Sequence, residues 1–119
     1  MILLDSNILI YASKNLINAR IFSHHEVGYA SVSAIESLGY HKIRASEMAI
    51  LQKILLGYDK IHLTDEIINR AVSLRQHKKM GLGDAIVAAS ALSNDCTLWT
   101  ANTEDFAHIS DLKLFNPLS

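Results

Sequence analysis

The chain opens with the stretch MILLDSN (residues 1–7), in which four apolar residues are followed at once by three polar ones. An uninterrupted apolar run of this kind is typical of a strand that is buried on both faces, as in a parallel sheet. Asp5, Ser6 and Asn7 are residue types that cap helices, and an apolar pattern resumes directly after them. We therefore predict a strand, a tight turn and then a helix.

The rest of the chain repeats this alternation of short apolar runs and helical patterns. The apolar runs predict further strands over 27–30, 60–63, 97–100 and 112–115. Helical spacing predicts helices over 15–25, 33–43, 48–55, 65–74 and 85–92, with a helical turn over 102–106. Alternating strands and helices indicate an α/β fold with a mainly parallel sheet of four to five strands and helices on both faces. We expect a single domain over residues 1–119, because this length leaves no room for a second.

Composition excludes several classes of protein. Half of the 119 residues are hydrophobic and the net charge is −1, so the chain can bury a core but is not a strongly basic polyanion binder. Cys96 is the only cysteine, which excludes an intramolecular disulfide and a cysteine-based zinc site. No signal peptide is evident, and no apolar run reaches the ~18 to 20 residues of a membrane span. We expect a soluble, cytoplasmic protein without membrane contact.

Acidic residues follow the predicted strands. Asp5 comes directly after the first strand, Glu36 lies about one turn beyond the second, and Asp84 begins a helix. Asn102 and Asp105 follow the strand over 97–100. In an open parallel sheet, ligands bind beyond the carboxyl ends of the strands, so we expect these side chains to gather there. Carboxylates in one cluster repel one another unless a cation compensates them, and oxygen ligands favour Mg²⁺ or Mn²⁺. Such an ion can activate a water for phosphodiester hydrolysis.

Four short motifs, taken in order, resemble those of PIN-domain nucleases, especially the VapC-type toxins of bacterial and archaeal toxin–antitoxin pairs. They are DSN (5–7), SAIE (33–36), GDAIVA (83–88) and TANTEDF (100–106). The resemblance covers nearly the whole chain and implies a PIN-like three-layer α/β/α fold. It also implies a Mg²⁺- or Mn²⁺-dependent endoribonuclease that hydrolyses RNA, forms a homodimer and is inhibited by a cognate antitoxin protein. An antitoxin would need an exposed apolar groove for a helix or an extended segment.

The same resemblance assigns roles to individual residues. Asp5, Glu36 and Asp84 match the family's metal-binding, catalytic acids, and Asp105 matches a further position that is commonly acidic. Asn102 stands where many members have aspartate, so the fourth corner of the metal site is open between Asn102 and Asp105.

Neighbouring polar residues are expected to support these acids. Ser6 and Asn7 can fix the orientation of Asp5, and Asn102 can bind a water or a phosphate.

Structural interpretations of these residues remain open. Asp5, Asp84 and Asn102 could simply cap helices, and Ser33 and Glu36 have the spacing of a capping box. The basic run over 75–79, the other helix-face cations and the scattered histidines are typical of solvated or structural positions.

Two other functions compete with metal-dependent cleavage. An aspartyl phosphatase usually has a second Asp two residues after the first, where this chain has Asn7. A degenerate PIN-like module would bind RNA or protein without cleaving it, and Asn102 keeps this alternative open.

Overall fold

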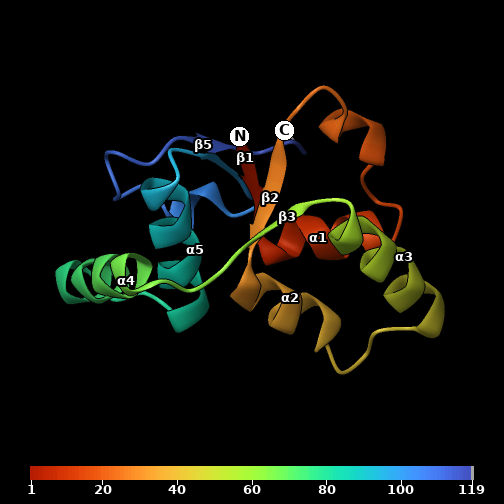
Figure 1. Cartoon of the computed structure of the whole chain (residues 1–119), viewed down its shortest axis with the longest axis horizontal. Helices are drawn as coiled ribbons and strands as arrows, with labels where there is room; N and C mark the ends of the chain where they lie inside the picture. The colour runs from red at the N-terminus through yellow and green to blue at the C-terminus, as the bar shows by residue number, and fades with distance from the viewer. Residues whose placement is uncertain (119) are drawn as a thin grey trace.

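The computed structural model of the chain describes residues 1–118 and contains one five-stranded, fully parallel sheet (Figure 1). The strands are β1 (Ile2–Leu4), β2 (Val27–Ala30), β3 (Asp59–Ile61), β4 (Thr97–Trp99) and β5 (Leu114–Phe115). Their order in the sheet is β3-β2-β1-β4-β5, so the opening strand of the chain is the central one. The predicted parallel α/β sheet is confirmed.

Helices cover both faces of the sheet (Figure 1). One core contains residues of α4 (Asp65–His77) and α5 (Leu82–Ser93), and the other contains residues of α1 (Ser6–Ser13) and α3 (Ala45–Leu56). The remaining helix, α2 (Ser31–Leu38), contacts α1, α3 and α5. It lies below the sheet in Figure 1, at the end toward which β1 and β2 run. The predicted three-layer α/β/α architecture is confirmed.

The apolar run at the start of the chain explains why the sheet has two cores. Successive side chains of a strand point to opposite faces. Leu3 accordingly packs with α4 and α5, whereas Ile2 and Leu4 pack with α1 and α3. Leu3 and Leu4 are both fully buried. Burial of one such side chain contributes about 1.5–3 kcal/mol relative to leaving it exposed.

The helix predicted over 15–25 is wrong. This segment contains only a 3₁₀ turn over Ala19–Phe22. Asn15 and His24 adopt left-handed φ values of 58° and 71°, which no helix accommodates. Between them the Asn18 side chain accepts a hydrogen bond from the Arg20 N–H at 3.0 Å. Local polar bonds of this type compete with helix formation.

Other elements differ from the prediction at their boundaries. The helix expected to reach Ile43 ends at Leu38, and β3 ends at Ile61 rather than at residue 63. α5 begins at Leu82, earlier than the predicted start at residue 85. The first residues of the basic run over 75–79 belong to α4, where Arg75 Nε donates to the Met80 carbonyl at 3.2 Å. Within residues 1–118, no helix is long and apolar enough to cross a membrane.

Candidate functional site

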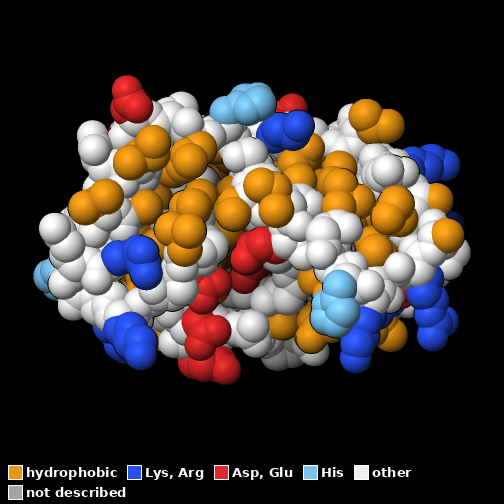
Figure 2. Space-filling view, turned by 90° about the horizontal axis from the view of Figure 1, so that it is seen from below, with side chains coloured by type: hydrophobic (Ala, Val, Ile, Leu, Met, Phe, Trp, Pro, Cys, Tyr) orange, Lys and Arg blue, Asp and Glu red, His pale blue; other side chains and the backbone are white. Residues whose placement is uncertain are grey.

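The carboxyl ends of the strands bring the four predicted acids into electrostatic contact. Asp5 follows β1, Glu36 lies in α2, Asp84 is in the first turn of α5, and Asp105 ends a 3₁₀ turn over Thr103–Asp105. The three other carboxylates all raise the pKa of Asp84. Figure 2, which views the molecule from this end, shows acidic side chains between two hydrophobic areas, with Lys and Arg side chains toward the margins.

Asp5 is the buried member of this group, with 5% of its surface exposed. Its Oδ1 accepts the Ser6 backbone N–H at 2.8 Å, which caps α1. Its Oδ2 accepts the Thr100 hydroxyl at 2.8 Å and the Asn7 amide at 3.4 Å. Burial raises the pKa of Asp5, and the bonds from Thr100 and Ser6 oppose this rise. Asp5 therefore caps a helix and belongs to the cluster at the same time.

Glu36 does not form the capping box that its spacing from Ser33 suggested. α2 begins at Ser31, which places both residues inside the helix, and the Ser33 hydroxyl is buried without a partner. Glu36 Oε1 instead accepts the Ser6 hydroxyl at 2.6 Å. A β-carbon on Gly83 would collide with the Glu36 carboxylate. The absent side chain at Gly83 thus lets Glu36 lie against the first turn of α5.

The pKa of Asp84 is raised to about 6. Burial is the main cause, followed by repulsion from Asp5, Asp105 and Glu36. The position in the first turn of α5 acts in the opposite direction, because a helix N-terminus favours negative charge. The raised pKa of Asp84 therefore means that burial and repulsion outweigh the effect of the helix N-terminus. A bound cation would offset the cost of burying the charge and the repulsion between the carboxylates.

The two candidates for the fourth corner differ in their surroundings. Asp105 raises the pKa of both Asp5 and Asp84, so its charge acts on the cluster. Asn102 is exposed, and its backbone N–H donates to Thr100 Oγ1 at 3.1 Å. The Asn102 side chain makes no capping hydrogen bond to the 3₁₀ turn that follows. The suggested capping role of Asn102 is therefore wrong.

Thr100 is a site residue to which the sequence pattern assigned no role. It is fully buried directly after β4 and contacts Asp5 across the sheet. A signal was available, since a hydroxyl residue follows β4 as the carboxylate of Asp5 follows β1. Asn7 joins the two, because its Oδ1 accepts the Ala101 N–H at 3.2 Å.

The donor chemistry of the cluster fits a hard divalent cation. It offers carboxylate oxygens from several elements and no cysteine or histidine, a set that suits Mg²⁺ or Mn²⁺. Across the described residues 1–118, no three His, Cys, Asp or Glu side chains are already arranged to hold a metal ion. The carboxylates would therefore have to close in around an ion, and their mutual repulsion is what an ion would remove.

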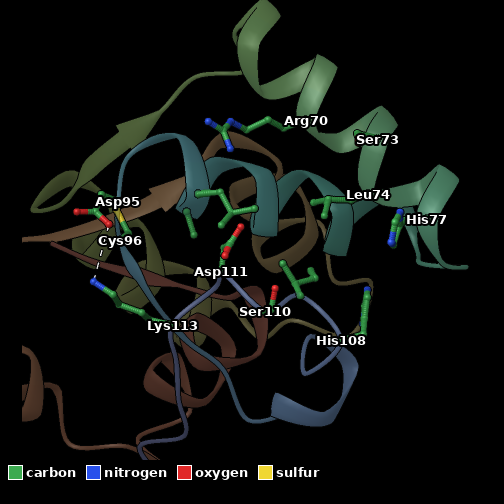
Figure 3. Close-up of a pocket in the computed structure, with 13 residues that line it drawn as sticks. Arg70, Ser73, Leu74, His77, Asp95, Cys96, His108, Ser110, Asp111 and Lys113 are labelled. Carbon is green, nitrogen blue, oxygen red and sulfur yellow. Dashed lines mark ion pairs between the residues drawn. The ribbon is translucent and has the colours of Figure 1, made fainter.

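A second charged region lies on the α4 side of the molecule (Figure 3). It is a cavity of about 410 Å³ between α4, the end of α5 and the segment before β5. Its cations have acidic partners: Lys113 lies 3.9 Å from Asp95, and Arg70 lies 3.6 Å from Glu66. None of the four clustered carboxylates lines it. This cavity is thus separate from the candidate site.

A family model for the PIN domain matches residues 2–112. The chain belongs to the PIN-domain family. Ribonuclease VapC10 of Mycobacterium tuberculosis is 30% identical over 123 residues, which cover 95% of this chain and 91% of that protein. The predicted resemblance to VapC-type PIN domains is confirmed.

Solved PIN-domain structures superpose over nearly all of the chain. A toxin–antitoxin complex from Klebsiella pneumoniae matches with a TM-score of 0.78 and 27% identity, covering 98% of both chains. VapBC2 from Rickettsia felis, bound to a DNA fragment from their promoter, matches with a TM-score of 0.81, 21% identity and the same coverage. At 21% identity, the likeness to VapBC2 shows a shared fold. Together they establish that the central sheet and its flanking helices have the PIN arrangement.

Proposed function

We propose that this PIN-domain protein is a divalent-metal-dependent endoribonuclease and the toxin of a toxin–antitoxin pair. The observation that carries the proposal is the carboxylate cluster, in which burial and the charges of Asp5, Asp105 and Glu36 raise the pKa of Asp84 to about 6. The similarity to a protein named as a ribonuclease, and to a toxin–antitoxin complex, supports the same conclusion.

We assign the binding of Mg²⁺ or Mn²⁺ to Asp5, Glu36, Asp84 and Asp105. Such an ion, when bound, would supply Lewis-acid chemistry, which polarises a phosphoryl oxygen and lowers the pKa of a water for phosphodiester hydrolysis. The protein's own contribution is placement. Ser6 holds Glu36 through its hydroxyl, at 2.6 Å, and holds Asp5 through its N–H, at 2.8 Å.

The same end of the sheet suits the phosphate groups of RNA. α1, α2 and α5 all begin there, and helix N-termini attract anions. The exposed Asn102 side chain has a free amide that can donate to a phosphate oxygen without adding negative charge.

Cleavage is favoured over the two alternatives by specific contacts. The charge of Asp105 acts on both Asp5 and Asp84, which supports Asp105 as the fourth acid and favours cleavage over a non-cleaving module. Asn7, at the position of a phosphatase's second aspartate, is engaged with Asp5 and with Ala101. The Asn7 side chain is an amide and cannot serve as the general acid that a phosphatase's second aspartate provides.

Two apolar grooves are available for protein partners, on either side of the acids (Figure 2). One, between α4 and α5, includes exposed Leu63, Ile68, Val72 and Leu82. The other, between α2 and α3, includes Leu56, of which 89% is exposed. We propose that these surfaces bind the antitoxin and a second copy of the chain, in the cytoplasm.

Incubation of the pure protein with total RNA tests the proposal. With Mg²⁺ present, mapping of the cleavage ends should reveal sites that are absent with EDTA and absent with Asp5→Ala. Cleavage that persists in Asp5→Ala, or no metal-dependent cleavage by the native protein, would overturn the assignment.

A further inference from the structure

The hydroxyl of Thr100 is the most connected buried polar group next to the acids. It donates to Asp5 Oδ2 at 2.8 Å and accepts from the Asn102 N–H at 3.1 Å and from Asn7 Nδ2 at 3.4 Å. A threonine hydroxyl has one donor and two acceptor positions, so all three are used. Thr100 is fully buried, so its hydroxyl is shielded from bulk solvent.

The direction of the Thr100–Asp5 bond is set by the other two partners. A backbone N–H and an amide NH₂ group can only donate, so both must use the acceptor positions of the hydroxyl. The single hydroxyl proton is then left for Asp5 Oδ2. Thr100 therefore acts as a fixed donor toward this carboxylate and cannot turn away without leaving partners unpaired.

The two carboxylate oxygens of Asp5 accept different numbers of hydrogen bonds. Each carboxylate oxygen has about two lone-pair positions. Oδ2 uses both, for Thr100 and for Asn7, whereas Oδ1 uses one, for the Ser6 N–H. Oδ1 is consequently the oxygen that retains a free lone pair.

We infer that Thr100 is a positioning residue, which holds Asp5 by Oδ2 so that only Oδ1 is free to bind a cation. The inference rests on the proposed metal-dependent function. Partners of this type, behind a metal ligand, commonly contribute about 10- to 100-fold to metal affinity or activity.

Titration with Mn²⁺, followed by calorimetry, tests this on the intact protein. Thr100→Val keeps the shape and removes the hydroxyl, and should weaken Mn²⁺ binding by about 10- to 100-fold. Thr100→Ser keeps the hydroxyl and should restore affinity to within about threefold of native. Ser90→Ala is the matched control, since it removes another buried hydroxyl, bonded to the Ile86 carbonyl, and should leave Mn²⁺ binding unchanged.

Thermal unfolding in EDTA separates positioning from a purely structural role. If Thr100→Val lowers the melting temperature but the folded protein binds Mn²⁺ as tightly as native, the inference is overturned. Equal losses in Thr100→Ser and Thr100→Val would also overturn it. If the native protein itself fails to bind Mn²⁺, the proposed function fails first.

A crystal structure of the native protein with Mn²⁺ gives a second test that does not depend on a folded variant. The ion should contact Asp5 Oδ1 while Thr100 Oγ1 remains bonded to Oδ2. An ion on Oδ2, with Thr100 displaced, would contradict the inference.

Discussion

The carboxylate cluster and the cavity below α4 are both charged, but they differ in how their charges are balanced. At the cavity, Lys113 lies 3.9 Å from Asp95, and Arg70 lies 3.6 Å from Glu66, which stands outside the cavity lining. In the cluster, acids face acids, and the pKa of Asp84 rises to about 6. Well-balanced ion pairs at a surface contribute little and require no ligand. A buried carboxylate among other carboxylates, rather than the presence of a cavity, therefore distinguishes the cluster from the second charged region.

Removal of one carboxylate from each region should give the largest difference in the rate of RNA cleavage. Asp84→Asn should lower the rate of Mg²⁺-dependent RNA cleavage by about 10³-fold, since several kcal/mol of transition-state stabilisation depend on the bound ion. Asp111→Asn makes the same change in the cavity and should leave the rate unaltered. Equal kcat/KM values for Asp84→Asn and native protein would remove the distinction between the two regions.

Substitutions at the two candidates for the fourth corner, Asp105 and Asn102, should have the next largest effect on RNA cleavage. Asp105→Asn should reduce kcat/KM by about 10- to 100-fold, because the charge of Asp105 acts on Asp5 and Asp84. Asn102→Ala removes a side chain without hydrogen bonds to the 3₁₀ turn and should cost less than about threefold. The reverse ranking would assign the corner to Asn102.

A hydroxyl in each region offers a finer comparison. Ser6→Ala removes the 2.6 Å bond to Glu36 and should reduce Mn²⁺ affinity by about tenfold. Ser110→Ala changes a hydroxyl that lines the cavity and should have no effect. Calorimetric titration of both variants under the same conditions measures the difference, and equal affinities would show that Ser6 does not position Glu36.

The smallest effect concerns stability and has a defined pH dependence. The folded-state pKa of Asp84 lies above its ordinary value of 3.8, at about 6, so the folded protein binds the proton more tightly. The stability from this group is therefore complete below about pH 4 and is lost as the pH rises through about 6. Asp84→Asn avoids the loss and should stabilise the metal-free protein at pH 8 by on the order of 1 kcal/mol, allowing for solvent screening.

Urea unfolding in EDTA at pH 4 and at pH 8 measures this gain. It should be present at pH 8 and absent at pH 4. A constant difference at both pH values would mean that the ionisation of Asp84 is not its cause.

Much of the fold followed from the sequence because its central strand is a short, wholly apolar run and the other strands alternate with helical patterns. Ile2, Leu3 and Leu4 are buried between the two helical layers, and the acids that follow the parallel strands converge by the geometry of parallel sheets. The segment 15–25 was mispredicted because its polar residues form local bonds that no hydrophobic pattern reveals.

The site was harder to predict in detail. The Ser33–Glu36 spacing suggests a capping box, and only the position of α2 across the sheet end directs Glu36 to Ser6 instead. Thr100 gave a weak signal because a threonine after a strand is common. Its partner Asp5 is distant in sequence, so its importance emerges only once β1 and β4 pair.

The bond between Asp5 and Thr100 joins residues 95 positions apart, and this separation affects the order of events during synthesis. A nascent chain that has emerged as far as α5 lacks β4, Thr100 and Asp105, and so has only three of the four acids. The residues of the two apolar grooves, between positions 29 and 86, have all been made by then. The residues that form the proposed partner surfaces therefore leave the ribosome before the last of the four acids, so partner binding need not wait for a complete carboxylate cluster.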